Sequence, residues 1–329
     1  MTLRQAQGKK RLVLIDGHAI LHRAYHALPP LTTSTGELVN AVYGFTTMLL
    51  KVIDELKPSY LIVAFDTPKP TFRHAEFVGY QAQRPKMEAE LASQLENVRR
   101  IIRAMGIPIF AVEGFEADDV IGTLAFQAVF RAERRGKRKT RKDAEKIEVV
   151  IVTGDRDLFQ LIGPQIKIYA PVKGMSEAQI FDAKRVKKKM GIEPQQIVDY
   201  KGLVGDPSDN YPGVPGIGPK TAAELLGKYR TIAGVYKNLG KLPESQARKL
   251  TEGAEMAELS RKLAKIVTDA PVELDLEKAQ FVFTDEEKGK AIEEFKVLGF
   301  RSLVARLGGE KKSKSKIKSK REDSQPKLF

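Results

Sequence analysis

Acidic residues follow four short apolar segments of this sequence. The acids are Asp16 after RLVLI (11–15), Asp66 after YLIVAF (60–65), Glu116, Asp118 and Asp119 shortly after IPIFAV (107–112), and Asp155 and Asp157 after IEVVIVTG (147–154). Carboxylate oxygens are hard ligands that bind divalent cations such as Mg²⁺. The chemistry open to these residues therefore depends on whether the fold brings them together.

The four apolar segments have the composition of buried strands. They are rich in β-branched residues and continuously apolar, as strands buried on both faces are. Helical patterns such as VYGFTTMLLKVIDEL and AELASQLENVRRIIRAM lie between them, and this alternation predicts an open, mostly parallel α/β sheet. The carboxyl ends of parallel strands lie along one edge, where ligands bind in such folds. We therefore expect acids that are distant in sequence to converge.

A convergent set of carboxylates requires cations, because like charges a few ångströms apart raise one another's pKa. The sequence has no cysteine and four histidines, so the ligands would be mainly oxygen atoms, which favour Mg²⁺ or Mn²⁺. We predict a site for two such ions, of the kind that catalyses phosphodiester hydrolysis.

Each acid alone is also compatible with a structural role. An Asp after a strand is often a helix N-cap, and Asp118 and Asp119 could interact with a helix dipole. The coincidence across four strand ends favours the metal site. On a regular helix Glu116 and Asp118 would point about 200° apart, so Asp118 has the weakest case for direct ligation.

Three histidines, His18, His22 and His26, have the i, i+4, i+8 spacing of a zinc-binding helix face. Pro29 and Pro30 follow closely and no HExxH pattern is present. We favour a harder ion than zinc, and expect the histidines to form local hydrogen bonds or to contact substrate phosphate.

A second acidic pair, Asp206 and Asp209, lies in the segment LVGDPSDNYPGVPGIGPKTA. Pro207 breaks regular structure there, which leaves both carboxylates on a turn. The GVPGIGPKTA portion has the form of a helix-hairpin-helix, whose tight turn and free helix N–H groups bind phosphate. The predicted DNA-backbone contacts are Gly216, Gly218, Lys220 and Thr221.

Composition and charge point to a basic protein of about two domains. The 329 residues carry a net charge of +14, which favours an anionic polymer as partner. The absence of cysteine, of a signal peptide and of a long apolar run leads us to expect a cytoplasmic protein without a membrane segment. Nine Lys/Arg fall within residues 131–146; we read these as a solvated helix end and loop in preference to a dedicated DNA contact.

The chain divides into four expected parts. Two shorter strands, IKIYA (166–170) and AQIFD (178–182), close the sheet, and helical patterns with Gly and Pro turns follow. We expect a disordered N-terminus at 1–9, an α/β domain at 10–182, a helical DNA-binding domain at 183–309 and a basic disordered tail at 310–329.

These motifs together resemble the 5′-nuclease (flap endonuclease) family, most closely the 5′–3′ exonuclease domain of bacterial DNA polymerase I. The resemblance extends from about residue 10 to about residue 305. It rests on VLIDGH, LTTSTGELVNAVYGF, VAFDTPKPTFRH, GYQAQRP, VEGFEADDVIG, VTGDRDLFQL and GDPSDNYPGVPGIGPKTA.

The resemblance implies an α/β nuclease domain with a helical arch, followed by a helix-three-turn-helix domain that binds duplex DNA through a K⁺ ion. It assigns the acids to two metal regions. Asp16, Asp66, Glu116, Asp118 and Asp119 correspond to one region, and Asp155, Asp157, Asp206 and Asp209 to the other.

The arch implied by the resemblance spans residues 70–91. Arg73 and Arg84 match family positions close to the scissile phosphate, and Tyr80 and Gln81 are expected at the DNA. The family commonly has Lys where this chain has Gln81, so we expect a slower enzyme or compensation from Lys86. Aromatic and basic side chains of the arch suit a single-stranded flap; the alternative is an ordinary amphipathic helix.

The function implied is a monomeric, stand-alone, structure-specific 5′ nuclease that acts on DNA with 5′ flaps, nicks or RNA primers during replication and repair. The alternatives are a DNA-junction-binding protein with impaired cleavage, an RNA-directed nuclease, and the N-terminal part of a DNA polymerase I. The final SQPKLF resembles the Gln-x-x-Leu-Phe pattern that docks on sliding clamps, through Gln325, Leu328 and Phe329. Chance similarity in a disordered end, or a boundary within a longer chain, would give the same pattern.

Overall fold

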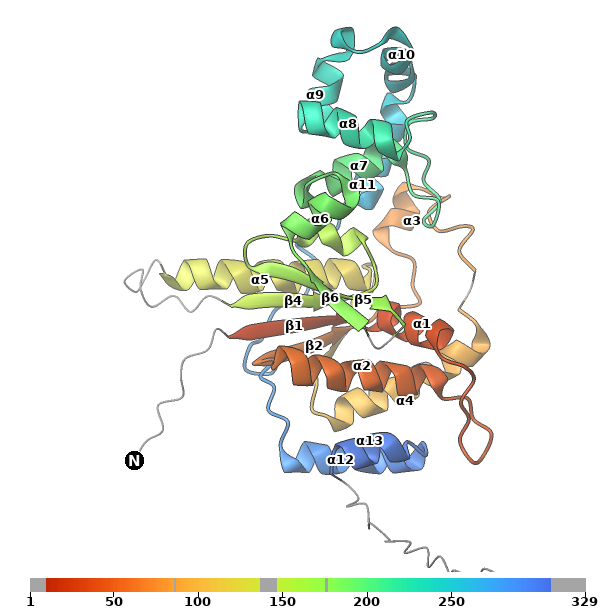
Figure 1. Ribbon diagram of the computed structural model, residues 1–329, viewed down its shortest axis with the longest axis vertical. Coiled ribbons are helices and arrows are strands. Elements are labelled where there is room, and N and C mark those ends of the chain that lie inside the picture. The colour runs from red at the N-terminus through yellow and green to blue at the C-terminus, as the bar shows by residue number, and fades with distance from the viewer. Residues whose placement is uncertain (1–9, 86, 137–146, 175–176, 309–329) are drawn as a thin grey trace, which may run out of the picture.

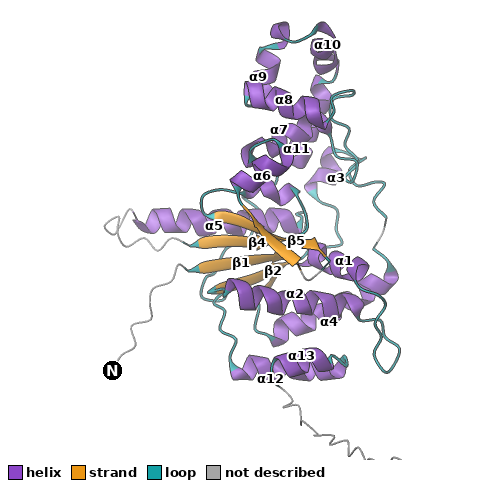
Figure 2. Cartoon of the chain, viewed as in Figure 1, coloured by secondary structure: helices purple, strands orange, loops and turns teal. Residues whose placement is uncertain are grey.

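The computed structural model describes residues 10–85, 87–136, 147–174 and 177–308. A central sheet has a group of helices on one face and one long helix on the other, and a further group of helices stands beyond that long helix (Figure 1). In the cartoon of Figure 2 the strands form one sheet, and the remainder of the described chain is helices and loops. Among the described residues, no helix has the length and apolarity needed to cross a membrane.

The sheet has six strands in the order β3-β2-β1-β4-β5-β6. Neighbouring strands are parallel except that β6 runs antiparallel to β5. The predicted mostly parallel α/β sheet is therefore confirmed. The strands are β1 (Arg11–Asp16), β2 (Tyr60–Ala64), β3 (Ile109–Phe110), β4 (Glu148–Val152), β5 (Ile166–Lys173) and β6 (Glu177–Phe181).

Alternating residues of the central strands fill two cores. On β1, Leu12 and Leu14 belong to one buried cluster, whereas Val13 and Ile15 belong to the other. Because both faces are covered, these strands are continuously apolar. The segment 107–112 keeps only a two-residue strand, β3, at the edge of the sheet.

One face of the sheet is covered by helices from both ends of the described chain (Figure 1). The helices of this layer are α1 (Gly17–Ala27), α2 (Asn40–Leu56), α4 (Ala89–Ala104), α12 (Asp285–Val297) and α13 (Arg301–Arg306). Phe295 of α12 is fully buried in the same cluster as Val98 of α4. The last two helices of the predicted 183–309 segment therefore pack on the α/β part of the molecule.

The opposite face is covered by α5 (Ala117–Gly136), which contacts β1, β2 and β4. Beyond it stand the remaining helices, with α8 to α10 farthest from the sheet (Figure 1). They are α6 (Ala183–Met190), α7 (Ile197–Val204), α8 (Pro219–Tyr229), α9 (Ile232–Lys237), α10 (Glu244–Glu252) and α11 (Ala254–Ala264).

The segment expected to form an arch leaves β2 and contains one short helix, α3 (Phe72–Glu76), before turns lead toward α4. Figure 1 shows it running along one side of the molecule. Residues 1–9 and 310–329, predicted to be disordered, lie outside the described residues, as do residue 309 and the stretch 137–146 of the basic insert.

Candidate active site

Acids from four strand ends and from one loop of the helical part line a single cavity of about 1060 Å³. They are Asp16, Asp66, Glu116, Asp118, Asp155, Asp157, Asp206 and Asp209. The parallel topology produces this convergence, because it places the carboxyl ends of β1, β2, β3 and β4 along one edge. Of the nine predicted metal-region acids, Asp119 alone is absent from the lining.

Asp16 ends β1 and also caps α1. Its Oδ1 accepts a hydrogen bond from the Ala19 backbone N–H at 3.0 Å, and its Oδ2 accepts one from the Thr153 hydroxyl at 2.8 Å. Burial and the nearby Asp66 and Asp155 raise its pKa to about 7, although both hydrogen bonds oppose this shift. The N-cap role and membership of the acidic cluster are therefore compatible.

Asp66 is held at the end of β2 by the start of α5. Its Oδ1 accepts the Ala117 backbone N–H at 2.7 Å, and His18 Nδ1 lies 3.1 Å from its Oδ2. His18 thus forms a local contact, as expected of the histidines. His22 and His26 stack on one another with ring centroids 6.4 Å apart. The candidate metal group found among the described residues contains no histidine.

The acids of the segment GFEADDVIG separate into two environments. Asp118 lines the cavity, and its pKa is raised well above its usual value by burial and by Asp155, Asp16 and Asp157. Asp119 is fully buried and forms an ion pair with Arg73. This corrects the expectation from helical spacing, since Asp118 faces the other acids and Asp119 does not.

Arg73 and Asp119 form a buried ion pair with two hydrogen bonds. Arg73 Nη1 and Nη2 donate to the two Asp119 oxygens at 2.7 and 2.9 Å. Arg73 also donates to the carbonyls of Leu263 and Lys265, and Val267 N–H donates to Asp119. Arg73 is 2% exposed and lines the wall of the cavity, and its contact with the scissile phosphate stays a prediction. The residue joins α3, α5 and the chain after α11.

Tyr80 is also buried, at the wall of the cavity. It is 3% exposed and stacks on Tyr211 with ring centroids 6.5 Å apart. Its hydroxyl donates a hydrogen bond to Glu116 Oε2 at 3.3 Å. Burial, Asp119 and Asp66 raise the pKa of Glu116 to about 7 in spite of Arg73. The expected position of Tyr80 at the DNA stays a prediction.

Gln81 faces an acid of the helical part. Its Nε2 donates to Asp209 Oδ1 at 3.0 Å, and its backbone N–H donates to the Asp209 carbonyl at 2.9 Å. Arg84 is exposed and lines the cavity, as a phosphate contact would require. Lys86, the predicted compensating cation, lies outside the described residues.

Asp155 and Asp157 lie on the turn that follows β4. Asp155 Oδ1 accepts the Asp157 backbone N–H at 2.8 Å, and Asp157 begins a short 3₁₀ helix, Asp157–Leu161. Burial and Asp155 raise the pKa of Asp157 to about 7, although Lys201 opposes the shift. Asp155 itself is exposed at the cavity.

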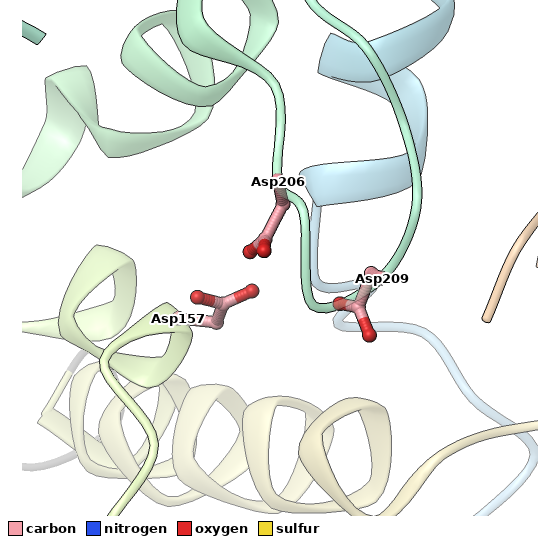
Figure 3. A group of neighbouring side chains, drawn as sticks. All are labelled: Asp157, Asp206 and Asp209. Carbon is pink, nitrogen blue, oxygen red and sulfur yellow. The ribbon is translucent and has the colours of Figure 1, made fainter. Parts of the chain in front are cut away.

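A metal-sized group forms where this turn meets the helical part. One ligand oxygen from each of Asp157, Asp206 and Asp209 lies within 4.8 Å of the others. Figure 3 shows the Asp157 and Asp206 carboxylates facing one another with Asp209 to one side. The acids that join the two parts of the chain are therefore close enough to share an ion.

The loop that carries Asp206 and Asp209 is closed by two glycines. Gly205 and Gly213 have φ of 77° and 64°. A Cβ on Gly213 would lie 2.3 Å from the Gly205 nitrogen. Only glycine fits such an approach at positive φ, so the two residues fix where the loop leaves α7 and returns.

Lys201, which the sequence analysis missed, lies within the acidic cluster. Its ammonium on α7 forms ion pairs with both Asp157 and Asp206. The sequence offered one indication of this role, which is that Lys201 lies five residues before Asp206. One lysine among 56 basic residues does not by itself predict such a contact.

The donor set fits a hard divalent ion. All the cavity acids offer oxygen, and burial together with mutual repulsion raises the pKa of several of them, which a cation would offset. The Tyr211 hydroxyl is buried without a hydrogen-bond partner in the described chain and interacts electrostatically with all three acids of the group. An ion with its water would satisfy such an atom.

The predicted phosphate-binding turn precedes α8. Gly216 has φ of 79°, Gly218 is the N-cap of α8 without a side-chain cap, and Pro219 is the first helical residue. Lys220 is exposed and Thr221 half-buried beside this helix start. Free N–H groups and an adjacent cation are the features that bind phosphate.

The chain matches two family models in succession. Residues 11–191 match the 5′-3′ exonuclease, N-terminal resolvase-like domain, and residues 192–287 match the 5′-3′ exonuclease, C-terminal SAM fold. The flap endonuclease of bacteriophage T5, solved as a pseudo-enzyme-product complex with DNA and metal ions, has a TM-score of 0.61 at 16% identity. That alignment covers 88% of this chain and 100% of the phage chain, and shows a common fold.

Two curated relatives differ in length. DNA polymerase I of Bacillus caldotenax is 43% identical over 300 residues, which are 91% of this chain and 32% of that protein. The chain thus spans about a third of the length of this polymerase. The 5′-3′ exonuclease of Aquifex aeolicus is 38% identical over 282 residues, which are 85% of this chain and 90% of that protein. On these matches, the chain belongs to the 5′-3′ exonuclease family.

Proposed function

We propose that this chain is a structure-specific 5′ nuclease that hydrolyses DNA phosphodiesters near the junction of duplex and 5′ single strand, with Mg²⁺ or Mn²⁺ as cofactor. The observation that carries the proposal is the convergence of eight acids on one cavity. A protein that only binds DNA gains nothing from carboxylates that repel phosphate.

The positions of the cavity residues suggest which of them bind metal ions and which bind phosphate. We propose that Asp157, Asp206 and Asp209 hold one ion and that Asp16, Asp118 and Asp155 hold the other. This division moves Asp155 from the region that the resemblance implied, because Asp155 acts electrostatically on Asp118. When bound, such ions supply the Lewis acidity that phosphodiester hydrolysis needs. Asp66 and Glu116 complete the cluster at the start of α5, and the exposed Arg84 offers its guanidinium to a phosphate oxygen.

DNA contacts are proposed at both ends of the cavity. The turn at Gly216 and Gly218, with Lys220 and Thr221, would bind backbone phosphates of the duplex, together with the K⁺ ion that the family resemblance implies. Contacts of this kind position DNA without reading its sequence. DNA is also present in the phage T5 structure of similar fold.

A 5′-flap duplex tests this proposal. We expect cleavage with Mg²⁺ or Mn²⁺ and none with EDTA, and a rate loss of at least about 100-fold for Asp155→Ala. Asp54→Ala is the matched control, since Asp54 lies on α2 away from the cavity and 65% of its side chain is exposed. Flap, nicked, RNA-primed and blunt duplexes compared side by side would define specificity. Tight binding to DNA without metal-dependent cleavage would support the junction-binding alternative instead.

Two further proposals concern partners. The tail residues Gln325, Leu328 and Phe329 are proposed to dock on a sliding clamp, a tethering device that raises local concentration. Deleting residues 325–329 should abolish clamp binding, and unchanged binding would contradict the idea. A monomer acting in the bacterial cytoplasm remains our proposal for assembly and localisation, testable by light scattering and cell fractionation.

A further inference from the structure

We propose that the Lys201 ammonium is a built-in counter-ion between Asp157 and Asp206, and that a divalent cation binds this group only by displacing it. The inference rests on the proposed metal-dependent function. It adds that one lysine makes the Asp157–Asp206–Asp209 group the weaker of the two metal positions.

Lys201 is placed inside the cluster and not at its rim. The exposed fractions of the paired side chains are 13% for Lys201, 18% for Asp157 and 14% for Asp206. Asp157 follows β4 and Asp206 follows α7, so the lysine links the α/β part to the helical part. An ammonium at neutral pH carries a full charge, and here it lies between two carboxyl groups.

Three of the carboxylate oxygens that could bind a metal already have partners in the protein. Asp206 Oδ2 pairs with Lys201, while Asp206 Oδ1 accepts hydrogen bonds from the backbone N–H and the hydroxyl of Ser208. Asp157 Oδ1 also accepts from Lys201. A divalent ion that binds Asp157 through Oδ1 and Asp206 through Oδ2 must therefore replace the ammonium.

The other metal position has no such competitor. Within the described part of the chain, no basic side chain forms an ion pair with Asp16, Asp118 or Asp155. No positively charged side chain paired with these acids therefore weakens their Coulomb attraction to a cation. We expect that position to fill first and the Asp157–Asp206–Asp209 group to fill second.

Calorimetric titration of the full chain with Mn²⁺, without DNA, tests this order. Wild type should bind ions in a tighter and a weaker step, and Lys201→Met should tighten the weaker step by about tenfold, which is about 1.4 kcal/mol. Lys69→Met is the matched control: Lys69 lines the same cavity but pairs with Glu113, and 61% of its side chain is exposed. An equal change in both variants, or no change in Lys201→Met, would overturn the inference.

A second measurement on wild type avoids dependence on the variant's folding. Amine-reactive labelling of Lys201, read by peptide mass spectrometry, should rise several-fold when saturating Mn²⁺ displaces the ammonium, while labelling of Lys69 should stay constant. Metal binding with unchanged Lys201 labelling would contradict this inference but leave the proposed function standing. Failure of wild type to bind any divalent ion would overturn the inference and the proposed function together.

Discussion

Individual residues decide how the cavity divides structural roles from chemical ones. Arg73 and Arg84 belong to the same arch segment, yet Arg73 is 2% exposed with its guanidinium on Asp119, whereas Arg84 is exposed at the cavity. A buried pair of this kind is costly to break from one side, because the remaining charge has no partner. The two arginines should therefore respond differently to the same substitution.

We predict that Arg73→Met lowers the free energy of unfolding by about 3–5 kcal/mol, because it leaves Asp119 charged and unpaired in the core. Arg84→Met, the matched control, should change it by less than about 0.5 kcal/mol while slowing flap cleavage. Urea unfolding measures both. Equal stability of the two variants would show that the Arg73 pair is not structural.

Gln81 stands where the family commonly has lysine and donates to Asp209 instead. We predict that Gln81→Lys raises the single-turnover cleavage rate between about tenfold and 100-fold, since a cation near the scissile phosphate stabilises transition-state charge. Gln83→Lys adds the same charge two residues away on the same cavity wall. A gain no larger than that of Gln83→Lys would mean that position 81 has no special role.

At the scale of elements, α12 and α13 pack with α2 and α4 although they follow the helical part in sequence. We predict that Phe295→Ala on α12 costs about 3–5 kcal/mol of unfolding free energy by leaving a cavity in that core. Val297→Ala two residues later, at a side chain that is 67% exposed, should cost less than about 0.5 kcal/mol. Chemical denaturation distinguishes them, and similar costs would contradict the packing.

The arrangement of helices and strands could be predicted only in part from the sequence. Apolar segments that are each followed by an acid were enough to predict the parallel sheet. They also predicted that Asp16, Asp66 and Asp155 lie close together, because parallel topology determines where strand ends lie. The orientation of Asp118 relative to Asp119 was not predictable. It depends on the partner that Asp119 finds in Arg73 and on the chain at Val267, which are tertiary contacts that helical spacing does not encode. The packing of α12 against α4 also depends on tertiary contacts, so it could not be predicted from the sequence either.

For the whole molecule, the cavity acids couple metal binding, pH and stability. Burial raises the pKa of Asp16 and Asp157 from 3.8 to about 7. The folded metal-free protein therefore binds more protons than the unfolded chain between about pH 4 and pH 7, and its stability falls as pH rises through that window. Divalent ions bind the ionised acids and release those protons.

We accordingly predict that Mg²⁺ raises the melting temperature more at pH 8 than at pH 5.5. At one hundred times its dissociation constant the ion should add about 2.7 kcal/mol of stability. Differential scanning fluorimetry with Mg²⁺ or EDTA, at matched ionic strength, checks this. A Mg²⁺ effect of the same size at both pH values would argue against ion binding by the raised acids.

The central claim is that the converging acids cut DNA at a structural junction. The most direct measurement maps the cut on a 5′-labelled flap duplex by denaturing electrophoresis, with Mg²⁺ and with EDTA. We predict a Mg²⁺-dependent product that ends within about one nucleotide of the junction, and none in EDTA. Stable binding of the same duplex without cleavage, or cuts spread along it regardless of the junction, would contradict the claim.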